Sequence, residues 1–188
     1  MDFKKLAEQY KTELLDSVLP FWLEKSQDKE FGGYFTCLDR EGNVFDTDKF
    51  IWLQGREVWM LSMLYNKVEK RQEWLDAAIQ GGEFLKKYGH DGNYNWYFSL
   101  TREGKPLVEP YNIFSYTFAT MAFGQLSIAT GNKEYADIAK KTFDIVSQET
   151  GFSGLFFMTA QAKGCKCIST FIYSREWHII LEQRVCEE

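Results

Sequence analysis

Apolar residues recur at helical spacing in five stretches of the chain, which predict helices near residues 3–26, 50–69, 72–88, 111–130 and 133–148. The stretches 72–88 and 133–148 are amphipathic, whereas 50–69 and 111–130 carry apolar or small residues nearly all round. We therefore expect the second pair to be inner helices, with the first pair outside them. Strands do not alternate with these helices in the way that builds a parallel sheet.

A short sequence repeats within the chain, because Leu38-Asp39-Arg40-Glu41-Gly42 returns roughly 60 positions later as Leu100-Thr101-Arg102-Glu103-Gly104. Each copy follows a Tyr-Phe pair and glycine-rich turn residues, so each predicts a short β-hairpin. A second match pairs residues 73–78 with 134–139, near the starts of two predicted helices. The repeating unit therefore holds two helices and one hairpin, as a toroidal α/α-barrel requires. About two and a half units are visible, and a closed ring of six would need roughly twice this length.

Composition and charge narrow the class of partner. The formal net charge is −5 and no run of Lys and Arg is present, which argues against a nucleic-acid partner. The first residues are charged and amphipathic, and no apolar stretch is long enough to span a membrane, so we expect a cytoplasmic protein with no membrane partner. The four cysteines lack the spacing of a disulfide framework and are expected to be reduced. Aromatic residues make up 17% of the chain, and they can fill a core or stack on sugar rings.

The most informative stretch opens the first predicted inner helix, where Arg56 stands among aromatic and apolar residues. Trp52, Trp59 and Met60 fall beside it at helical spacing. A buried guanidinium needs a carboxylate, carbonyl oxygens or an oxygen-rich ligand. Two interpretations stay open on spacing alone: an internal ion pair with Glu57 or another acid, and a pocket for a ligand rich in oxygen.

The run Trp52-Leu53-Gln54-Gly55-Arg56, followed by Trp59-Met60, resembles the signature of the N-acylglucosamine 2-epimerase family. The similarity covers about residues 1–148. It continues through Phe21-Trp22, Gly32-Gly33-Tyr34-Phe35-Thr36-Cys37-Leu38, Gly81-Gly82-Glu83-Phe84-Leu85, Ile113-Phe114-Ser115 and Met121-Ala122. The resemblance implies an all-α fold, a partial (α/α)6 barrel with short β-hairpin connectors, whose active site lies in the central funnel.

Within the matched motifs, our candidate substrate-binding residues are Arg56, Trp52, Gln54, Phe114 and Ser115. The resemblance makes Arg56 a contact for the sugar oxygens near the reacting carbon. Epimerisation at C2 of the sugar needs a base on each face of that carbon and a cationic or hydrogen-bonding group at the developing oxyanion. Histidine suits the first role and arginine the second. The expected partner is a small-molecule amino sugar; no cofactor and no metal are expected, and the family commonly forms homodimers.

The catalytic residues are not identified by the sequence. The family's catalytic histidines lie in its later repeats, and this chain contains only His90 and His178, neither of them in a matching motif. His90 precedes a predicted turn and is expected to be a loop residue. His178 lies in a stretch, residues 176–182, that an amphipathic helix would fit, which is a weak pattern for catalysis. Three further aromatic residues of the second inner helix are explained equally well by core packing: Tyr111, Tyr116 and Phe118.

After Gln148 the repeat pattern stops and three cysteines follow. We therefore expect residues 1–148 to be the N-terminal part of a barrel domain and residues 149–188 to be a divergent tail, produced by a shifted reading frame or a truncated gene. A zinc site on Cys165 and Cys167 is the competing interpretation, although Cys186 and His178 do not complete a recognised ligand spacing.

The sequence thus predicts a sugar isomerase that epimerises N-acylglucosamine and N-acylmannosamine at C2, with little or no activity in this chain alone. A mannose isomerase or cellobiose 2-epimerase is a related alternative. A non-catalytic remnant or carbohydrate-binding module is an alternative from another class, favoured by the absence of histidines in matching motifs.

Overall fold

The structure is a computed structural model that describes residues 2–110, 113–149, 157–162, 165–170, 172–173 and 178–179. It divides into two compact units, Met1–Val146 and Ser147–Glu188. All candidate substrate-binding residues belong to the first unit. No helix in the described part of the chain combines the length and apolar character needed to cross a membrane.

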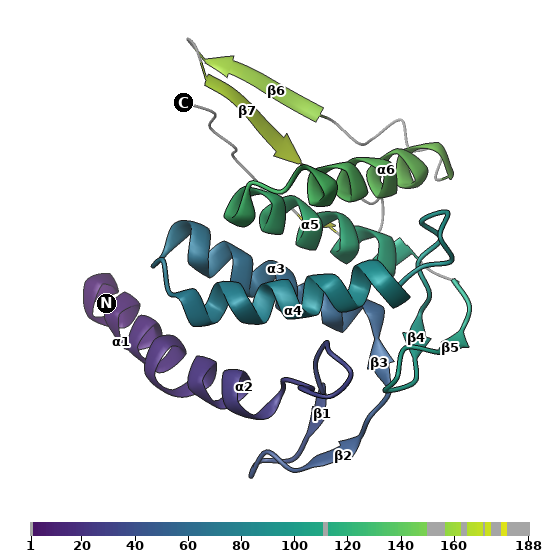
Figure 1. Ribbon diagram of the computed structural model, residues 1–188. Helices are drawn as coiled ribbons and strands as arrows, with labels where there is room; N and C mark the ends of the chain where they lie inside the picture. The colour runs from purple at the N-terminus through teal and green to yellow at the C-terminus, as the bar shows by residue number, and fades with distance from the viewer. Residues whose placement is uncertain are drawn as a thin grey trace. The chain divides into compact units, whose positions relative to one another are not determined.

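The helices are, in chain order, α1 (Phe3–Glu13), the π-helical turn η1 (Leu14–Val18), α2 (Leu19–Lys25), α3 (Ile51–Lys67), α4 (Gln72–Tyr88), α5 (Ile113–Thr130) and α6 (Lys133–Glu149). The five predicted helices are confirmed, since α1, η1 and α2 follow one another directly as the first of them (Figure 1). Gly131 adopts a positive φ of 70° directly after α5. Asn132 then starts α6, because its side-chain oxygen accepts a hydrogen bond from the backbone N–H of Glu134 at 3.0 Å.

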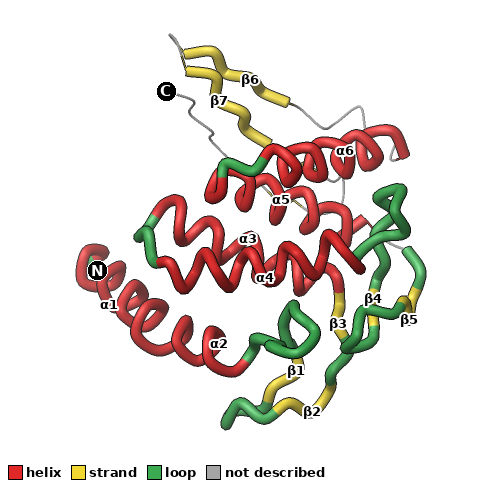
Figure 2. The backbone as a smooth tube through the Cα atoms, in the orientation of Figure 1, coloured by secondary structure: helices red, strands yellow, loops and turns green. Residues whose placement is uncertain are grey.

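The strands of the first unit are short and all antiparallel. They are β1 (Cys37–Leu38), β2 (Val44–Asp46), β3 (Lys49–Phe50), β4 (Ser99–Leu100) and β5 (Pro106–Val108). Strands β1 and β2 form one hairpin, and the second hairpin, β4 and β5, is joined by β3 in the order β3-β4-β5 (Figure 2). Both predicted hairpins are therefore confirmed, and each lies shortly before an inner helix.

The repeated Leu-x-Arg-Glu-Gly sequence makes the same turn in both hairpins. Gly42 and Gly104 have φ angles of 86° and 92°, in the left-handed region that favours glycine. The N–H of Gly42 donates to the carbonyl of Asp39 at 3.1 Å, and that of Gly104 donates to the carbonyl of Thr101 at 3.0 Å. The similarity in sequence is thus a similarity in backbone conformation.

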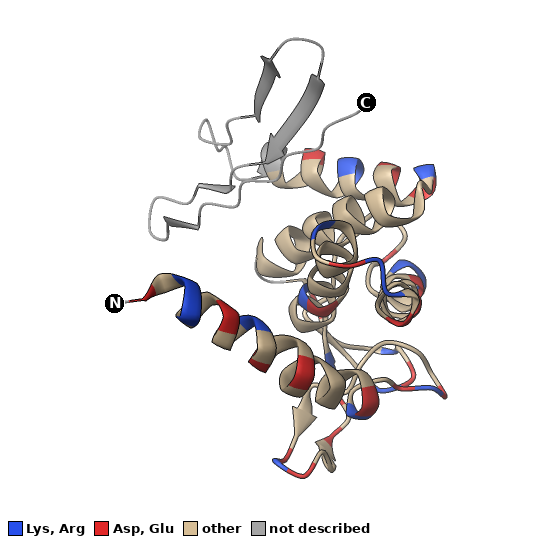
Figure 3. Cartoon of the chain, turned by 90° about the vertical axis from the view of Figure 1, so that its left-hand side faces the viewer, with Lys and Arg blue, Asp and Glu red and all other residues tan. Residues whose placement is uncertain are grey.

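Helices α3 and α5 lie side by side, and α4 packs against both of them (Figure 1). Charged residues form bands along α1, α2 and α6, whereas α5 contains none (Figure 3). The core is built where these helices meet, with Val58, Ala122 and Phe123 fully buried. This arrangement confirms α3 and α5 as the inner pair, and it buries Tyr116, as core packing predicts.

Each hairpin loop is tied to the outer helix that follows it in the ring. Tyr34 donates its hydroxyl hydrogen bond to the carbonyl of Ala77 in α4 at 2.7 Å. At the matching place in the next repeat, the indole N–H of Trp96 donates to the hydroxyl of Thr142 in α6 at 3.0 Å. Both aromatic side chains are fully buried, so each repeat uses one large ring to join its loop to the core.

In the second unit, the described backbone forms two antiparallel pairs: β6 (Phe157–Ala162) with β7 (Cys165–Thr170), and β8 (Ile172–Tyr173) with β9 (His178–Ile179). The helix considered for residues 176–182 is wrong at His178, which pairs with Tyr173 in a strand. Residues 176–177 and 180–182 of that stretch, and Cys186, lie outside the described residues. Among the residues searched, no group of three or more His, Cys, Asp or Glu side chains could hold a metal ion.

Candidate functional site

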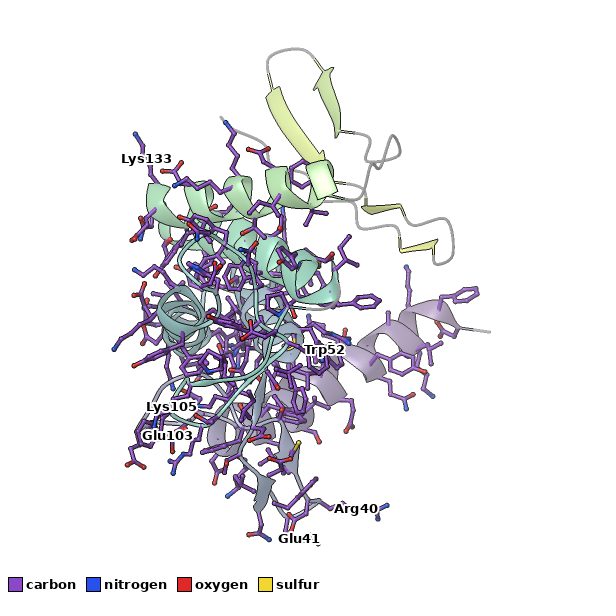
Figure 4. The ribbon with its side chains drawn as sticks, turned by 90° about the vertical axis from the view of Figure 1, so that its right-hand side faces the viewer. Arg40, Glu41, Trp52, Glu103, Lys105 and Lys133 are labelled. Atoms are coloured by element: carbon purple, nitrogen blue, oxygen red, sulfur yellow. The ribbon has the colours of Figure 1, made fainter. Side chains whose placement is uncertain are left out.

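The candidate site is at the start of the inner helices. Helix α3 begins immediately after β3, where the N–H of Ile51 donates to the carbonyl of Phe98 at 3.0 Å and so fixes the helix start to the second hairpin. Trp52 therefore lies in the first turn of α3. Figure 4 labels this residue and shows both hairpin tips, marked by Arg40 and Glu41 and by Glu103 and Lys105, on the same side of the helices. The second hairpin and the first turns of α3 and α5 lie at the same end of these helices (Figure 1).

A buried ion pair fixes the strand from which α3 starts. Lys49 and Asp28 have fully buried side chains, with 2.9 Å between the ammonium nitrogen of Lys49 and a carboxylate oxygen of Asp28. Lys49 also donates to the carbonyls of Gly32 at 2.6 Å and Arg102 at 2.9 Å. Burial alone would raise the pKa of Asp28, but hydrogen bonds from Arg102, Lys49 and the backbone of Phe31 outweigh it and lower this pKa to about 2. The Asp28 carboxylate is therefore ionised at neutral pH, whereas burial lowers the pKa of Lys49 against the raising effects of its hydrogen bond to Asp28 and of the Asp28 charge.

Arg56 lies one turn beyond Trp52 and is exposed rather than buried. Its guanidinium carbon is 5.9 Å from the ring centre of Trp52 and 5.4 Å from that of Phe118 on α5. These two rings are 6.2 Å apart and tilted by 44°. Within residues 2–110 and 113–146, no acid forms an ion pair with Arg56. The guanidinium thus lies beside two aromatic rings that contact each other, without a counter-charge from the described residues.

Glu57 does not neutralise Arg56. Its carboxylate accepts a hydrogen bond from the hydroxyl of Ser26 at 2.7 Å, at the end of α2. Burial raises the pKa of Glu57 to about 7, against the lowering effect of the Ser26 hydrogen bond. No pattern in the sequence predicts this contact, since Ser26 and Glu57 are far apart in the chain and follow no repeat.

Gln54 faces away from Arg56, toward the loop that precedes β1. Its side-chain N–H donates to the carbonyl of Tyr34, and its oxygen accepts from the N–H of Tyr34, both at 2.8 Å. The side chain is fully buried. Both polar atoms are therefore engaged in holding this loop against α3, and a contact between Gln54 and a sugar stays a prediction.

Phe114 and Ser115 lie in the first turn of α5, the helix that also carries Phe118, and Phe118 forms the Arg56 cluster together with Trp52 and Arg56. Phe114 is 46% exposed, which leaves a large apolar surface accessible. Ser115 is buried, and its hydroxyl has no hydrogen-bond partner among the described residues. A buried hydroxyl without a partner is costly, and such groups are often satisfied by water or a ligand. Sugar binding by either residue stays a prediction.

Phe118 is the residue of this cluster that the sequence explained equally well by core packing and that was therefore not among the candidate site residues. The repeat aligns Trp52 with Phe114 and Arg56 with Phe118, so only one copy carries the charge. Gly55 lets α5 approach closely, because a Cβ at this position would come within 2.9 Å of the Phe118 backbone. Two features of the sequence could thus have pointed to Phe118: the internal repeat, and the glycine next to Arg56.

His90 has the loop role that the sequence predicted. Its Nδ1 accepts a hydrogen bond from the N–H of Gly92 at 3.0 Å, and its ring stacks on Tyr94 with 4.8 Å between centres. Burial lowers the pKa of His90, although Asp91 opposes the change.

A groove of about 390 Å³ lies elsewhere, between α2 and the start of α4, and none of its lining residues belongs to the Arg56 cluster.

Comparison with known proteins identifies the class. Residues 33–161 match the N-acylglucosamine 2-epimerase (GlcNAc 2-epimerase) family, and the chain belongs to this family. It is 45% identical to the N-acylglucosamine 2-epimerase of Mus musculus over 146 residues, which are 76% of this chain and 34% of the mouse protein. It is 26% identical to the cellobiose 2-epimerase of Bacteroides fragilis over 185 residues, 97% of this chain and 44% of that protein.

A solved structure supports the same architecture. The crystal structure of a sugar epimerase from a ruminal bacterium matches with a TM-score of 0.70 and 25% identity, over 93% of this chain and 42% of that chain. The helix pairs and hairpins are therefore part of an (α/α)6 barrel. The chain spans about a third of the length of the mouse N-acylglucosamine 2-epimerase that it matches.

Proposed function

We propose that this chain supplies the Arg56 wall of the active site in an epimerase that interconverts N-acylglucosamine and N-acylmannosamine at C2, by removal and return of a proton. The observation that carries the proposal is the guanidinium of Arg56, exposed and placed within 6 Å of two aromatic ring centres, with no ion pair to a described acid. Its N–H donors are therefore available to a ligand with several oxygens.

The chemistry of C2 epimerisation explains why such a group is needed. The proton at C2 is acidic only when the sugar is open and the negative charge moves onto O1. A cation beside O1 stabilises that charge as it develops, and arginine keeps its charge throughout the pH range of enzymes. In this proposal Arg56 donates to the sugar oxygens, and the rings of Trp52 and Phe114 pack against the C–H faces of the sugar.

The groups that move the proton are proposed to come from parts of the barrel that this chain does not share with its longer relatives. His90 is engaged in its own loop through Nδ1. His178 lies in β9, in the unit separate from Arg56. For the chain on its own we therefore expect sugar binding with little or no turnover.

Two alternatives rest on specific observations. A cellobiose 2-epimerase is supported by the alignment with the Bacteroides fragilis protein, although the 45% identity to the mouse protein favours an N-acylated sugar. A carbohydrate-binding remnant is supported by the sequence, in which neither histidine stands in a motif that matches the family. A cytoplasmic location and a homodimer stay predictions from the sequence and the family resemblance.

A chimeric enzyme tests the proposal. Residues 1–146 of this chain would replace the matching segment of the mouse N-acylglucosamine 2-epimerase, and conversion of N-acetylmannosamine to N-acetylglucosamine would be measured. We expect an active chimera whose kcat/KM falls by about a hundredfold or more on Arg56→Gln, since a charge-stabilising donor is lost. Arg40→Gln, at an exposed hairpin tip, is the matched control and should leave the rate unchanged.

Three outcomes would change the conclusion. A folded chimera that retains full activity with Arg56→Gln would remove Arg56 from the site. A chimera that epimerises cellobiose and leaves N-acetylmannosamine untouched would support the first alternative. Turnover by the 188-residue chain alone would place the proton-moving groups within these residues.

A further inference from the structure

The guanidinium of Arg56 is held by side chains of two different repeats. Trp52 is on the same helix one turn earlier, and Phe118 comes from α5 in the next helix pair. Of the two rings, Phe118 is closer, with 5.4 Å between its centre and the guanidinium carbon against 5.9 Å for Trp52. An arginine with no ion pair has many rotamers of similar energy, so these rings are what restricts it.

The approach of Phe118 to Arg56 depends on how closely α3 and α5 pack. A Cβ on Gly55 would lie 2.9 Å from the carbonyl carbon of Phe118 and 3.0 Å from its Cβ and oxygen, closer than real Cβ contacts allow without a shift. Glycine at position 55 is therefore required for the observed spacing. Because Gly55 is next to Arg56, this contact sets the separation of the two helices at the turn that carries Arg56.

The internal repeat indicates that Phe118 is not a core residue common to both copies of the repeat. Phe118 occupies the position in α5 that Arg56 occupies in α3, and it is only partly buried. An aliphatic side chain would fill the same space against Trp52 with less restriction of the cation. The ring adds an attraction to the guanidinium that aliphatic groups lack.

We propose that Phe118 is a positioning residue for Arg56, which holds the guanidinium at the funnel wall so that its N–H donors can reach the sugar oxygens. This inference rests on the proposed function for the role of the sugar, but the contact itself exists without a ligand. Phe118 does not take part in the proton transfer. It reduces the conformational freedom that Arg56 would otherwise lose on binding.

The first test reads the contact directly in the sugar-free 188-residue chain. The side-chain Nε–Hε resonance of Arg56, assigned by its loss in Arg56→Gln, should be shifted by the ring current of Phe118. Phe118→Leu should move it toward the position of an ordinary arginine, and Phe118→Tyr should restore most of the shift. Phe21→Leu, which removes a ring that packs on Trp22 and lies over no cation, is the control and should leave the resonance in place.

The second test measures affinity for N-acetylmannosamine by NMR titration. We expect Phe118→Leu to weaken binding by about threefold to tenfold, as the loss of a cation–π contact predicts, with Phe118→Tyr close to the original chain. An unchanged resonance in Phe118→Leu, or unchanged affinity beside a clear loss in Arg56→Gln, would overturn the inference. Equal affinity in Arg56→Gln would instead overturn the proposed function, while the resonance still decides whether Phe118 holds Arg56.

Discussion

Replacing Asp28 by Asn is expected to destabilise the first unit far more than any surface change. The variant leaves the ammonium of Lys49 fully buried without its anion. In Asp28, one carboxylate oxygen accepts hydrogen bonds from both Lys49 and Arg102, each at 2.9 Å. In the variant, the amide group of Asn would point its own N–H at these two donors. Breaking a buried pair from one side costs about 3–5 kcal/mol, because the remaining charge is uncompensated.

The contacts that remain in Asp28→Asn place the expected loss of stability near the lower end of this range. Lys49 keeps hydrogen bonds to two carbonyls, and its ammonium lies 4.4 Å from the ring centre of Phe84. The new Asn keeps one oxygen that can still accept from the N–H groups of Glu30 and Phe31. We therefore expect Asp28→Asn to lower the free energy of unfolding by about 3 kcal/mol, a large part of the stability of a typical domain.

Urea unfolding followed by far-ultraviolet circular dichroism measures this loss. The matched control is Glu30→Gln, because Glu30 pairs with the same Arg102 at 3.0 Å but is 64% exposed, and such pairs contribute about 0–1 kcal/mol. Adding Lys49→Met to Asp28→Asn should recover part of the loss, since the stranded charge is removed. A cost below about 1 kcal/mol for Asp28→Asn, equal to that of Glu30→Gln, would refute the reasoning.

Three further predictions concern the same unit. The pKa of Asp28 is lowered to about 2, so its stabilising contribution is complete above the unfolded pKa near 4 and should be lost as pH falls from 4 through 2. Acid unfolding of the original chain, with Asp28→Asn as the reference, would detect this loss. The pKa of Glu57 is raised to about 7, so its charged form destabilises the fold as pH rises. Glu57→Gln, which keeps an acceptor for Ser26, should be more stable than the original chain by about 1–3 kcal/mol near pH 8.5 and nearly equal to it near pH 4, below the unfolded pKa; equal stability at both pH values would contradict this. Gly81→Ala should lower the melting temperature strongly, because its Cβ would overlap the ring of Tyr34, whereas Gly92→Ala, with open space around it, tests the cost of a positive φ alone.

The sequence predicted the helices and hairpins because their signals are local. The apolar period distinguishes α3 and α5 from the outer helices, and the repeated Leu-x-Arg-Glu-Gly sequence carries a glycine at the position that needs a positive φ in each turn. The π-helical turn η1 was not predicted, since residues 14–18 have the same apolar pattern as an ordinary helix. His178 shows the limit of periodicity, because the short apolar run around it fits a helix in the sequence while His178 and Ile179 form a strand.

The candidate site was predicted only in part. The single charge in an aromatic helix pointed to Arg56, but spacing alone could not decide between an ion pair with Glu57 or another acid and a pocket for a ligand rich in oxygen. That choice depends on contacts between segments far apart in the chain, namely Ser26 with Glu57 and Phe118 with Arg56. Gln54 illustrates the same limit, because a motif residue can serve the backbone of a neighbouring loop instead of a ligand.

The central claim is that Arg56 contacts sugar oxygens, and a binding titration of the 188-residue chain tests it most directly. N-acetylmannosamine and N-acetylglucosamine would be titrated into the original chain, Arg56→Gln and Arg40→Gln. We predict that Arg56→Gln weakens binding by about tenfold or more, as the loss of charge-assisted hydrogen bonds requires, and that Arg40→Gln has no effect. Binding of equal strength in Arg56→Gln and the original chain would contradict the account.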